Sequence, residues 1–336
     1  MKWNMLVVTD HSTHAESNSL YQLCHALRHD HRCGQLWVAS RGLEQNRAFF
    51  DGQPDADIHA SAVDDQFEFD ATGRSFLQSV ITLDRDHIDV ILVRIPQPFD
   101  PVFLFSLEAI VPPSHIINSP EGIVETATKS FLLQVSYLCP EPILCNSLEE
   151  ALAFSRQKEI VLKPLYSYGG RGIVRIAQDY CWNEDVRFPI DQLPTFLSDS
   201  QFPMLAMKFL KNVTQGDKRT IVVNREILGS ALRLPAPGSW MCNVAQGGHA
   251  EIAEPDEDER IIGDILTPML HRKGVVMFGF DTLVDDDGRR VLSEINTLSI
   301  GGLVPLQEMS GRPVLKRAAT LLWDYLTPQP PERGSN

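Results

Sequence analysis

Cysteine is scarce in this chain, and its spacing excludes several classes of protein. No two cysteines form a Cys-x-x-Cys pair, and none has the spacing to histidine that is typical of zinc ligands. A chain of this length can also bury a sufficient core without disulfides. We therefore expect reduced thiols and neither a disulfide scaffold nor a zinc ribbon. The cysteines stand at positions 24, 33, 139, 145, 181 and 242.

Long apolar runs are also missing. No stretch approaches the roughly 20 apolar residues that cross a bilayer. Residues Met1 to Met5 lead directly into a short β-branched run, without the apolar core and small-residue cleavage site of a signal peptide. These absences predict a soluble, cytoplasmic protein that does not bind membranes.

Positive charge is in short supply as well. The chain has 30 Lys and Arg against 44 Asp and Glu, a formal net charge of -14, and its basic residues are scattered singly or in pairs. A field of that sign repels phosphate backbones, so we expect no nucleic-acid partner. Any polyanionic ligand would need a small, focused site.

The first third of the sequence alternates strand-like and helical patterns. Residues 20–27 have apolar side chains at the i, i+3, i+4, i+7 spacing of an amphipathic helix. Apolar runs surround this helix, and the longest of them is continuous, as in a parallel strand covered on both faces. The order predicts a doubly wound (Rossmann-like) α/β domain over residues 1–122. The runs are Leu6 to Thr9, Leu36 to Ala39, Ile88 to Ile95 and His115 to Asn118.

A glycine-rich hairpin dominates the second region, residues 123–200. A helix is expected to start after Ser119-Pro120 and to include Lys129. Glu159 to Leu165 is strand-like, Tyr166 to Gly172 is rich in glycine, and Gly172 to Ile176 is the returning strand. Two strands joined in this way form a flap and not a strand-to-helix phosphate loop.

The third region, residues 201–327, combines strands with two helical segments. A long stretch, Pro235 to Ala253, has no apolar periodicity and is expected to be an irregular functional loop. Residues 328–336 are predicted to be a frayed tail. The expected strands are Met204 to Leu210, Lys218 to Val223, Ile227 to Leu234, Val275 to Val284 and Val291 to Ile295, and the expected helices are Ile261 to Lys273 and Pro313 to Tyr325.

An oxygen-rich group of residues stands on the last predicted hairpin. Asp281 and Glu294 can face each other across an Asp-Gly turn, and Asn296 shares the face of Glu294 because residues i and i+2 of a strand point the same way. Such a set suits Mg²⁺. The alternative is a solvated polar face, but the apolar residues that flank this hairpin favour a buried metal site.

Basic residues form a second group of candidates. Lys163 ends a strand just before the glycine-rich flap, where its charge and nearby backbone N–H groups could meet phosphate. Arg219 and Arg233 lie in consecutive strands, where arginines are usually paired with an anion. Nearby, Asp217 could accept a hydrogen bond from a ribose hydroxyl. The alternatives are a simple turn for the flap, solvated surface residues for the lysines, ordinary surface or ion-pair residues for the arginines, and a strand-end turn for Asp217.

The order of these features resembles the ATP-grasp superfamily, and the local sequences resemble bacterial glutathione synthetase. The similar stretches are spread over about residues 88–297 in the family's order. They are ILVRIPQPFD (91–100), INSPE (117–121) with Lys129, IVLKPLYSYGGRG (160–172), GDKRTIVV (216–223), ALRLP (231–235), NVAQGGHAE (243–251), Gly279 to Asp281, and Glu294 to Asn296.

This resemblance implies an ATP-grasp fold with an N-terminal pre-ATP-grasp domain, and ATP and Mg²⁺ as cofactors, with two ions expected and Mn²⁺ as an alternative. The residues implied to bind ATP are Lys129 and Lys163 at the phosphates, Tyr168, Gly169, Gly170 and Gly172 in the flap, Met207, Lys208, Phe209 and Leu210 at adenine, and Asp217 near the ribose. The implied metal ligands are Asp281, Glu294 and Asn296. The residues implied in catalysis are Arg219 and Arg233, with Asn243, Gly247 and Gly248 in a mobile loop.

The sequence departs from the family where the substrates would bind. It has Arg94-Ile95-Pro96-Gln97-Pro98 where the family has Arg-Lys-Asp-Pro-Pro. Met241 and His249 replace arginines of the mobile loop, and Thr297 to Gly302 replaces Val-Thr-Ser-Pro-Thr. The resemblance therefore implies the reaction class more firmly than the product.

The implied reaction is ATP-dependent ligation of a carboxylate to an amine through an acyl phosphate. The expected partners are a small-molecule acid and amine, with γ-glutamylcysteine and glycine as the pair that makes glutathione, and the family implies a homo-oligomer. Three alternatives stay open: a ligase for another acid–amine pair or a peptide, a catalytically silent nucleotide-binding regulator, and a kinase that stops at phosphoryl transfer.

Overall fold

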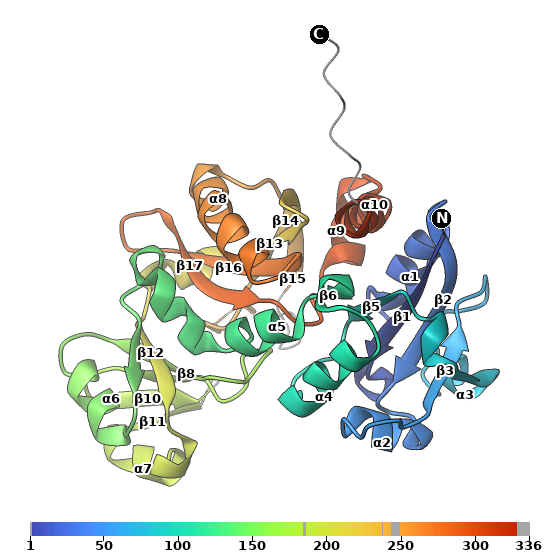
Figure 1. Cartoon of the computed structure of the whole chain (residues 1–336). Coiled ribbons are helices and arrows are strands. Elements are labelled where there is room, and N and C mark those ends of the chain that lie inside the picture. The colour runs from blue at the N-terminus through green and yellow to red at the C-terminus, as the bar shows by residue number, and fades with distance from the viewer. Residues whose placement is uncertain (1, 184–185, 237, 243–248, 328–336) are drawn as a thin grey trace.

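Three β-sheets organise the chain in the computed structural model, which describes residues 2–183, 186–236, 238–242 and 249–327. One sheet belongs to the N-terminal part, and the other two lie beside each other in the rest of the molecule (Figure 1). This mixture of helices and strands confirms the predicted α/β class. Among the described residues, no helix combines the length and the apolar character needed to cross a membrane.

The first sheet has the strand order β4-β3-β2-β1-β5-β6. Strands β1, β2, β5 and β6 are parallel, as predicted, and β3 and β4 add an antiparallel edge that the sequence did not reveal, because both strands are short. Its strands are β1 (Trp3–Thr9), β2 (Cys33–Ser40), β3 (Ile58–Ala62), β4 (Val80–Leu83), β5 (Val90–Val93) and β6 (Ile116–Ile117). Its helices are α1 (Leu20–Arg28), α2 (Arg47–Phe50), α3 (Arg74–Leu77), α4 (Pro101–Ser106) and α5 (Pro120–Thr126).

The second sheet, with the order β11-β10-β9-β8-β12-β7, contains the predicted flap. Strands β8 and β9 are antiparallel, so the glycine-rich hairpin prediction is confirmed. Strand β12 lies beyond the predicted boundary at residue 200 and pairs with β8, with Leu205 opposite Lys163. The elements are β7 (Ile143–Cys145), α6 (Leu148–Ser155), β8 (Ile160–Pro164), β9 (Val174–Ile176), β10 (Tyr180–Asn183), β11 (Val186–Pro189), α7 (Leu193–Phe196) and β12 (Met204–Lys208).

The third sheet is antiparallel, in the order β15-β14-β13-β16-β17. The segment expected to be irregular as far as Ala253 in fact ends in strand β15, which pairs with β14. That prediction was wrong there because five residues beside a glycine-rich stretch carry too little periodicity. The elements are β13 (Asp217–Val223), β14 (Glu226–Leu234), β15 (His249–Ala253), α8 (Glu257–Arg272), β16 (Met277–Val284) and β17 (Arg290–Asn296).

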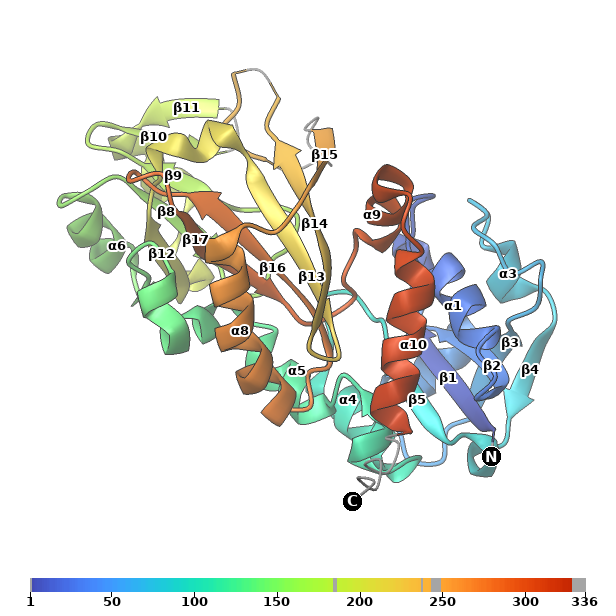
Figure 2. The same ribbon diagram turned by 90° about the horizontal axis from the view of Figure 1, so that it is seen from above.

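Two C-terminal helices, α9 (Leu303–Ser310) and α10 (Val314–Leu326), return the chain to its beginning. Helix α10 lies beside α1 in both ribbon views (Figures 1 and 2), and the indole Nε1 of Trp323 donates to Leu27 O at 3.2 Å. Short 3-10 turns connect the elements: η1 (His11–Thr13), η2 (Glu44–Asn46), η3 (Arg85–His87), η4 (Leu107–Ala109), η5 (Pro113–His115), η6 (Lys129–Leu138), η7 (Ile190–Gln192), η8 (Asp199–Gln201) and η9 (Lys211–Gln215).

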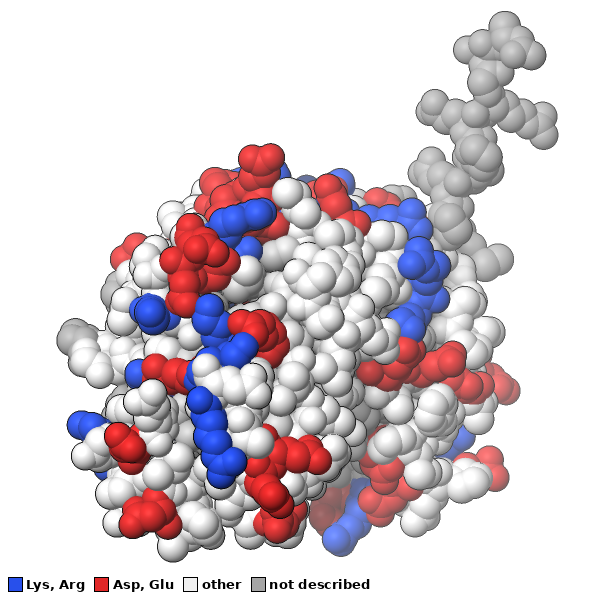
Figure 3. Space-filling view, turned by 90° about the vertical axis from the view of Figure 1, so that its left-hand side faces the viewer, with Lys and Arg blue, Asp and Glu red and all other residues white. Residues whose placement is uncertain are grey.

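The hydrophobic core is continuous across the first and third sheets. One cluster joins Leu23 and Leu27 of α1 with Trp323 of α10 and Phe278 of β16, and the second sheet has its own smaller cluster. On the face shown in Figure 3, basic side chains lie among acidic ones. The second sheet has this smaller core on one face, contributes Leu205 and Met207 of β12 to the larger cluster, and borders the pocket described next, which lies between it and the third sheet.

Candidate active site

A pocket of about 380 Å³ brings most of the predicted residues together. Its walls come from the flap and β12 on one side and from β13, β14, β16 and β17 on the other. The predicted residues that line it are Lys129, Lys163, Tyr168, Gly169, Gly170, Met207, Lys208, Phe209, Leu210, Asp217, Arg219, Arg233, Asp281, Glu294 and Asn296.

Among the described residues, one predicted residue, Gly172, does not line this pocket. Gly172 has a φ of 71°, and a Cβ atom there would lie 3.1 Å from Pro164 Cγ, so its place in the flap is a tight turn. Asn243, Gly247 and Gly248 lie outside the described residues.

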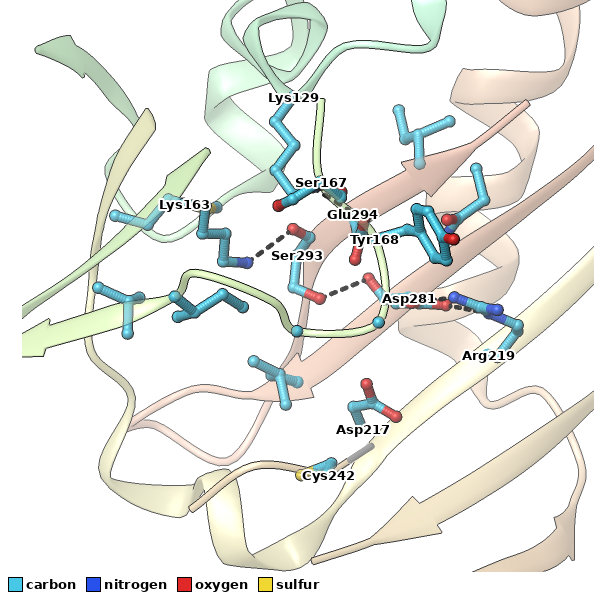
Figure 4. Close-up of a pocket in the computed structure, with 18 of the residues that line it drawn as sticks. Lys129, Lys163, Ser167, Tyr168, Asp217, Arg219, Cys242, Asp281, Ser293 and Glu294 are labelled. Carbon is cyan, nitrogen blue, oxygen red and sulfur yellow. Dashed lines mark hydrogen bonds and ion pairs between the residues drawn. The ribbon is translucent and has the colours of Figure 1, made fainter. Parts of the chain in front are cut away.

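The two predicted lysines meet above the hairpin of β16 and β17 (Figure 4). Lys163 is buried, and its Nζ donates to Ser293 O at 3.1 Å. Burial lowers the pKa of the Lys163 ammonium, against the opposing attraction of Glu294. The Nζ of Lys129 donates to Ser167 O of the flap and lies 3.3 Å from Glu294 Oε1. Two ammonium groups therefore converge at one end of the pocket.

Lys129 is not on the helix that the sequence predicted. Helix α5 ends at Thr126, and Lys129 begins the separate turn η6. The break has a local cause, because the Thr128 side chain accepts from Ser130 N and caps the new turn. The turn directs Lys129 toward the flap.

The oxygen-rich set has the predicted cross-strand register. Asp281 lies opposite Glu294, and Gly279 lies opposite Asn296. The ladder is irregular between Asp281 and Thr282, where Ser293 is the extra residue and its Oγ donates to the Asp281 carbonyl at 3.1 Å. This bulge was not predicted, and it is what presents the Ser293 carbonyl to Lys163.

Two arginines and two aspartates form an ion network on the floor of the pocket. Arg219 is the cross-strand partner of Asp281, and Arg233 is that of Asp217. Both pairs are bidentate, with N···O distances of 2.7 Å in the first and 2.6 Å in the second. Arg233 Nη2 also reaches Asp281 Oδ2 at 2.8 Å. Two positive and two negative charges thus compensate one another.

The pKa values of the two carboxyl groups in this network shift in opposite directions. Burial alone would raise the pKa of Asp281, but the charges and hydrogen bonds of Arg219 and Arg233 outweigh it and hold that pKa well below its usual range. Burial raises the pKa of Asp217 to about 6, although Arg233 opposes the shift. Asp281 is therefore the firmly ionised member, as a metal ligand should be.

The chemistry of the donor set fits Mg²⁺. Asp281 and Glu294 offer carboxylate oxygens and Asn296 an amide oxygen, and the buried Nδ2 of Asn296 has no hydrogen-bond partner among the described residues. In the part of the chain that the structure describes, no three His, Cys, Asp or Glu side chains group to hold a metal. The candidate set therefore has two carboxylates and one amide, which leaves positions for water and phosphate.

Several lining residues were missed by the sequence reasoning. Trp240 meets the predicted Phe209 edge to face, with ring centroids 6.0 Å apart, and Cys242 Sγ donates to Val213 O at 3.4 Å. Burial raises the pKa of the Cys242 thiol to about 12. No motif marks Trp240 and Cys242, because they come from the long segment after β14, and only the fold brings that segment under the flap.

Comparisons with known proteins agree with this geometry. Residues 128–311 match the family described as prokaryotic glutathione synthetase, ATP-grasp domain. The glutathione synthetase of Mesorhizobium japonicum is 30% identical over 248 residues, which are 73% of this chain and 74% of that protein.

Two solved structures share the fold. D-cycloserine synthetase DcsG aligns with a TM-score of 0.62 at 12% identity, covering 96% of this chain and 99% of its own. The ATP-grasp ligase PsnB, in a complex with a minimal precursor, Mg and ADP, aligns with a TM-score of 0.55 at 13% identity, covering 96% of this chain and 98% of its own. Because the family match spans more than half of the sequence, the chain belongs to the prokaryotic glutathione synthetase family and is an ATP-dependent ligase that forms carbon–nitrogen bonds.

Proposed function

We propose that the chain joins γ-glutamylcysteine to glycine and releases glutathione, ADP and phosphate. The relative from Mesorhizobium japonicum is named a glutathione synthetase and aligns over most of its length. The observation that carries the proposal is the grouping of two lysines, two arginines and an oxygen-rich donor set in one pocket between two sheets. Phosphoryl transfer followed by acyl transfer needs those groups and no protein nucleophile.

ATP and Mg²⁺ are the cofactors of ATP-grasp ligases, and the PsnB complex contains Mg and ADP. We assign the phosphates to Lys129 and Lys163, whose ammonium groups converge under the flap. Asp281, Glu294 and Asn296 would hold two Mg²⁺ ions, with Mn²⁺ as a substitute. The bound metal would supply charge neutralisation at the phosphates.

Adenine and ribose are assigned to the opposite end of the pocket. The N–H of Phe209 already donates to Glu159 O at 2.8 Å, so the remaining main-chain groups of residues 207–210 are the candidates to read adenine. Phe209, Leu283 and Trp240 supply apolar walls for the base. Asp217 would accept a hydrogen bond from a ribose hydroxyl in addition to the two from Arg233, since each carboxylate oxygen has two lone pairs.

The reaction has two balanced steps. A carboxylate oxygen of the acid attacks the γ-phosphorus, the bond to the bridging oxygen breaks, and ADP leaves. The amine nitrogen then attacks the acyl carbon, the bond to the phosphate oxygen breaks, and the nitrogen loses a proton to water. The ion pairs engage Nε and Nη2 of Arg219 and Arg233, and a guanidinium has five N–H donors, so donors are left for the developing oxyanion.

A second candidate is a ligase for a different acid–amine pair or a peptide. One specific observation favours it: the pocket wall supplied by residues 96–97, 127–128 and 298–300 consists of neutral residues. They are Pro96, Gln97, Ala127, Thr128, Leu298, Ser299 and Ile300. Gln97 Nε2 donates to Ala127 O at 3.1 Å, so it helps to shape this wall.

The larger organisation is also a proposal. We assign residues 1–122 to a Rossmann-like pre-ATP-grasp domain, 123–200 to the lid and 201–327 to the subdomain with the metal site. We further propose a cytoplasmic homo-oligomer, as in the resembled family.

Phosphate release from Mg·ATP tests the proposed function. The purified protein is given γ-glutamylcysteine, with and without glycine, and the products are identified by mass spectrometry. We expect phosphate release only when both substrates are present, together with one glutathione and one ADP per phosphate. ADP and a phosphorylated acid without an amide would indicate a kinase instead. A protein that binds Mg·ATP and releases no phosphate would contradict this substrate pair, and a screen of other acids and amines would then separate the second candidate from a silent regulator.

A further inference from the structure

The segment Thr297–Gly302 connects the metal-site hairpin to helix α9 and forms part of the pocket. It directly follows Asn296, and its first five residues line the pocket. Ser299 has a φ of 40°, in the left-handed region that side chains other than glycine adopt at a cost. Such a conformation persists only where the surrounding structure enforces it. The segment must therefore be held in place by tertiary contacts.

Two side chains from the N-terminal half hold the beginning of this segment. Asn118 Nδ2 donates to Thr297 O at 2.7 Å, and its amide makes three further hydrogen bonds, to the backbone of Val276 and Met277. Thr126 Oγ1 donates to Thr297 Oγ1 at 2.9 Å. Both contacts lie at Thr297, upstream of the strained Ser299.

Arg94 binds the main chain directly after the strained Ser299. Its Nη2 donates to Ile300 O at 2.7 Å and to Ser19 Oγ at 3.3 Å. The side chain of Ile300 packs on β16, where a Cβ at Gly279 would lie 3.2 Å from Ile300 Cγ2. The side chain of Ile300 is thus fixed by the third sheet and its carbonyl by Arg94.

The charge of Arg94 is unusual in its surroundings. The residue is 3% exposed, and its Nε is buried without a hydrogen-bond partner. Among the described residues, no carboxylate lies within ion-pair distance of its guanidinium. Burial lowers the Arg94 pKa to about 10, so the group remains protonated at neutral pH. A buried cation without an anion costs free energy that an apolar side chain would not, so stability alone does not account for it.

We propose that Arg94 is a positioning residue that fixes the conformation of Thr297–Gly302 and thereby shapes the substrate end of the pocket. The contact to Ile300 O transmits this effect, because the guanidinium's hydrogen bonds within the described part of the chain are to Ser19, Met277 and Ile300, and none of these three is assigned to the nucleotide. Substrate binding should therefore depend on Arg94 more than nucleotide binding does. The kinetic part of this inference rests on the proposed function, whereas the conformational part does not.

The test compares Arg94→Met, Arg94→Lys and the control Arg85→Met. Arg85 also donates to a backbone carbonyl, Ala56 O at 2.7 Å, but far from the pocket. Hydrogen exchange of peptides covering residues 297–302 should be faster by about tenfold or more in Arg94→Met, intermediate in Arg94→Lys and unchanged in the control. The KM of one substrate should rise about tenfold while the Kd of Mg·ATP stays within about twofold of wild type.

Two results would overturn the inference. One is unchanged exchange in residues 297–302 of a folded Arg94→Met protein. The other is a loss spread equally over nucleotide affinity, KM and kcat, with no recovery in Arg94→Lys, as expected from a purely structural role. If Arg94→Met does not fold, Arg94→Gln against Arg94→Lys provides the same comparison. If the wild type itself releases no phosphate with γ-glutamylcysteine and glycine, the proposed function fails, and the exchange measurement alone decides the inference.

Discussion

Replacing Glu294 by glutamine is expected to lower kcat/KM by about a thousandfold, or roughly 4 kcal/mol of transition-state stabilisation, and to leave the fold intact. Glu294 is partly exposed, and its ion-pair contact is with Lys129 at 3.3 Å. The amide keeps the size of the side chain and removes the negative charge from the metal site. Steady-state kinetics at several Mg²⁺ concentrations measures the loss, which excess Mg²⁺ should partly reverse.

The matched control is Glu226→Gln. Glu226 forms an exposed ion pair with Arg317, away from the pocket, and should have wild-type activity. Asp281→Asn is harder to interpret, because it also removes the charged partner of two arginines. We expect it to lower the free energy of unfolding by about 3–5 kcal/mol. Full Mg²⁺-dependent activity in Glu294→Gln would show that the metal ligands are assigned wrongly.

Replacing Lys163 by methionine is expected to change activity and stability in opposite directions. Loss of a phosphate-binding charge should lower kcat/KM by about a hundredfold to a thousandfold. Burial lowers the pKa of this ammonium, which means that its charge is unfavourable in the folded protein. An apolar side chain of similar length should therefore leave Tm unchanged or raise it.

Kinetics and thermal melting of the same preparations check this expectation. Lys158→Met is the control, because Lys158 pairs with Glu141 near the surface of the second sheet and does not line the pocket. A parallel fall of Tm and activity in Lys163→Met would indicate that Lys163 has a structural role and does not bind phosphate.

The sequence predicted the elements of the site better than their contacts. Asp281 and Glu294 lie opposite each other because an Asp-Gly turn and strand alternation determine the register of a hairpin. The sequence predicts that Arg219 and Arg233 pair with an anion, the resemblance implies that this anion is substrate, and the structure pairs them with Asp281 and Asp217. The Arg233–Asp217 pair lies within the hairpin of β13 and β14. The Arg219–Asp281 pair depends on the register between β13 and β16, two strands far apart in the chain, which no local pattern contains.

Local exceptions explain the remaining errors. The bulge at Ser293 adds one residue to a regular alternation, and Thr128 ends one helix and caps the next turn. Helix α9 was not predicted, because its eight residues follow the Gly301-Gly302 pair without a side-chain cap. The strain at Ser299 and the burial of Arg94 are tertiary properties, and Ser299 lies in the part of the pocket where the sequence departs from its family.

The central claim, ligation through an acyl phosphate, is tested most directly with an acid substrate whose carboxylate carries ¹⁸O. During turnover with Mg·ATP and the amine, mass spectrometry measures the isotope content of the released phosphate. We predict one ¹⁸O atom transferred to each phosphate, because the attacking carboxylate oxygen leaves with the phosphoryl group. Phosphate without ¹⁸O, carrying oxygen from water instead, would contradict the account and show that ATP is hydrolysed without activation of the acid.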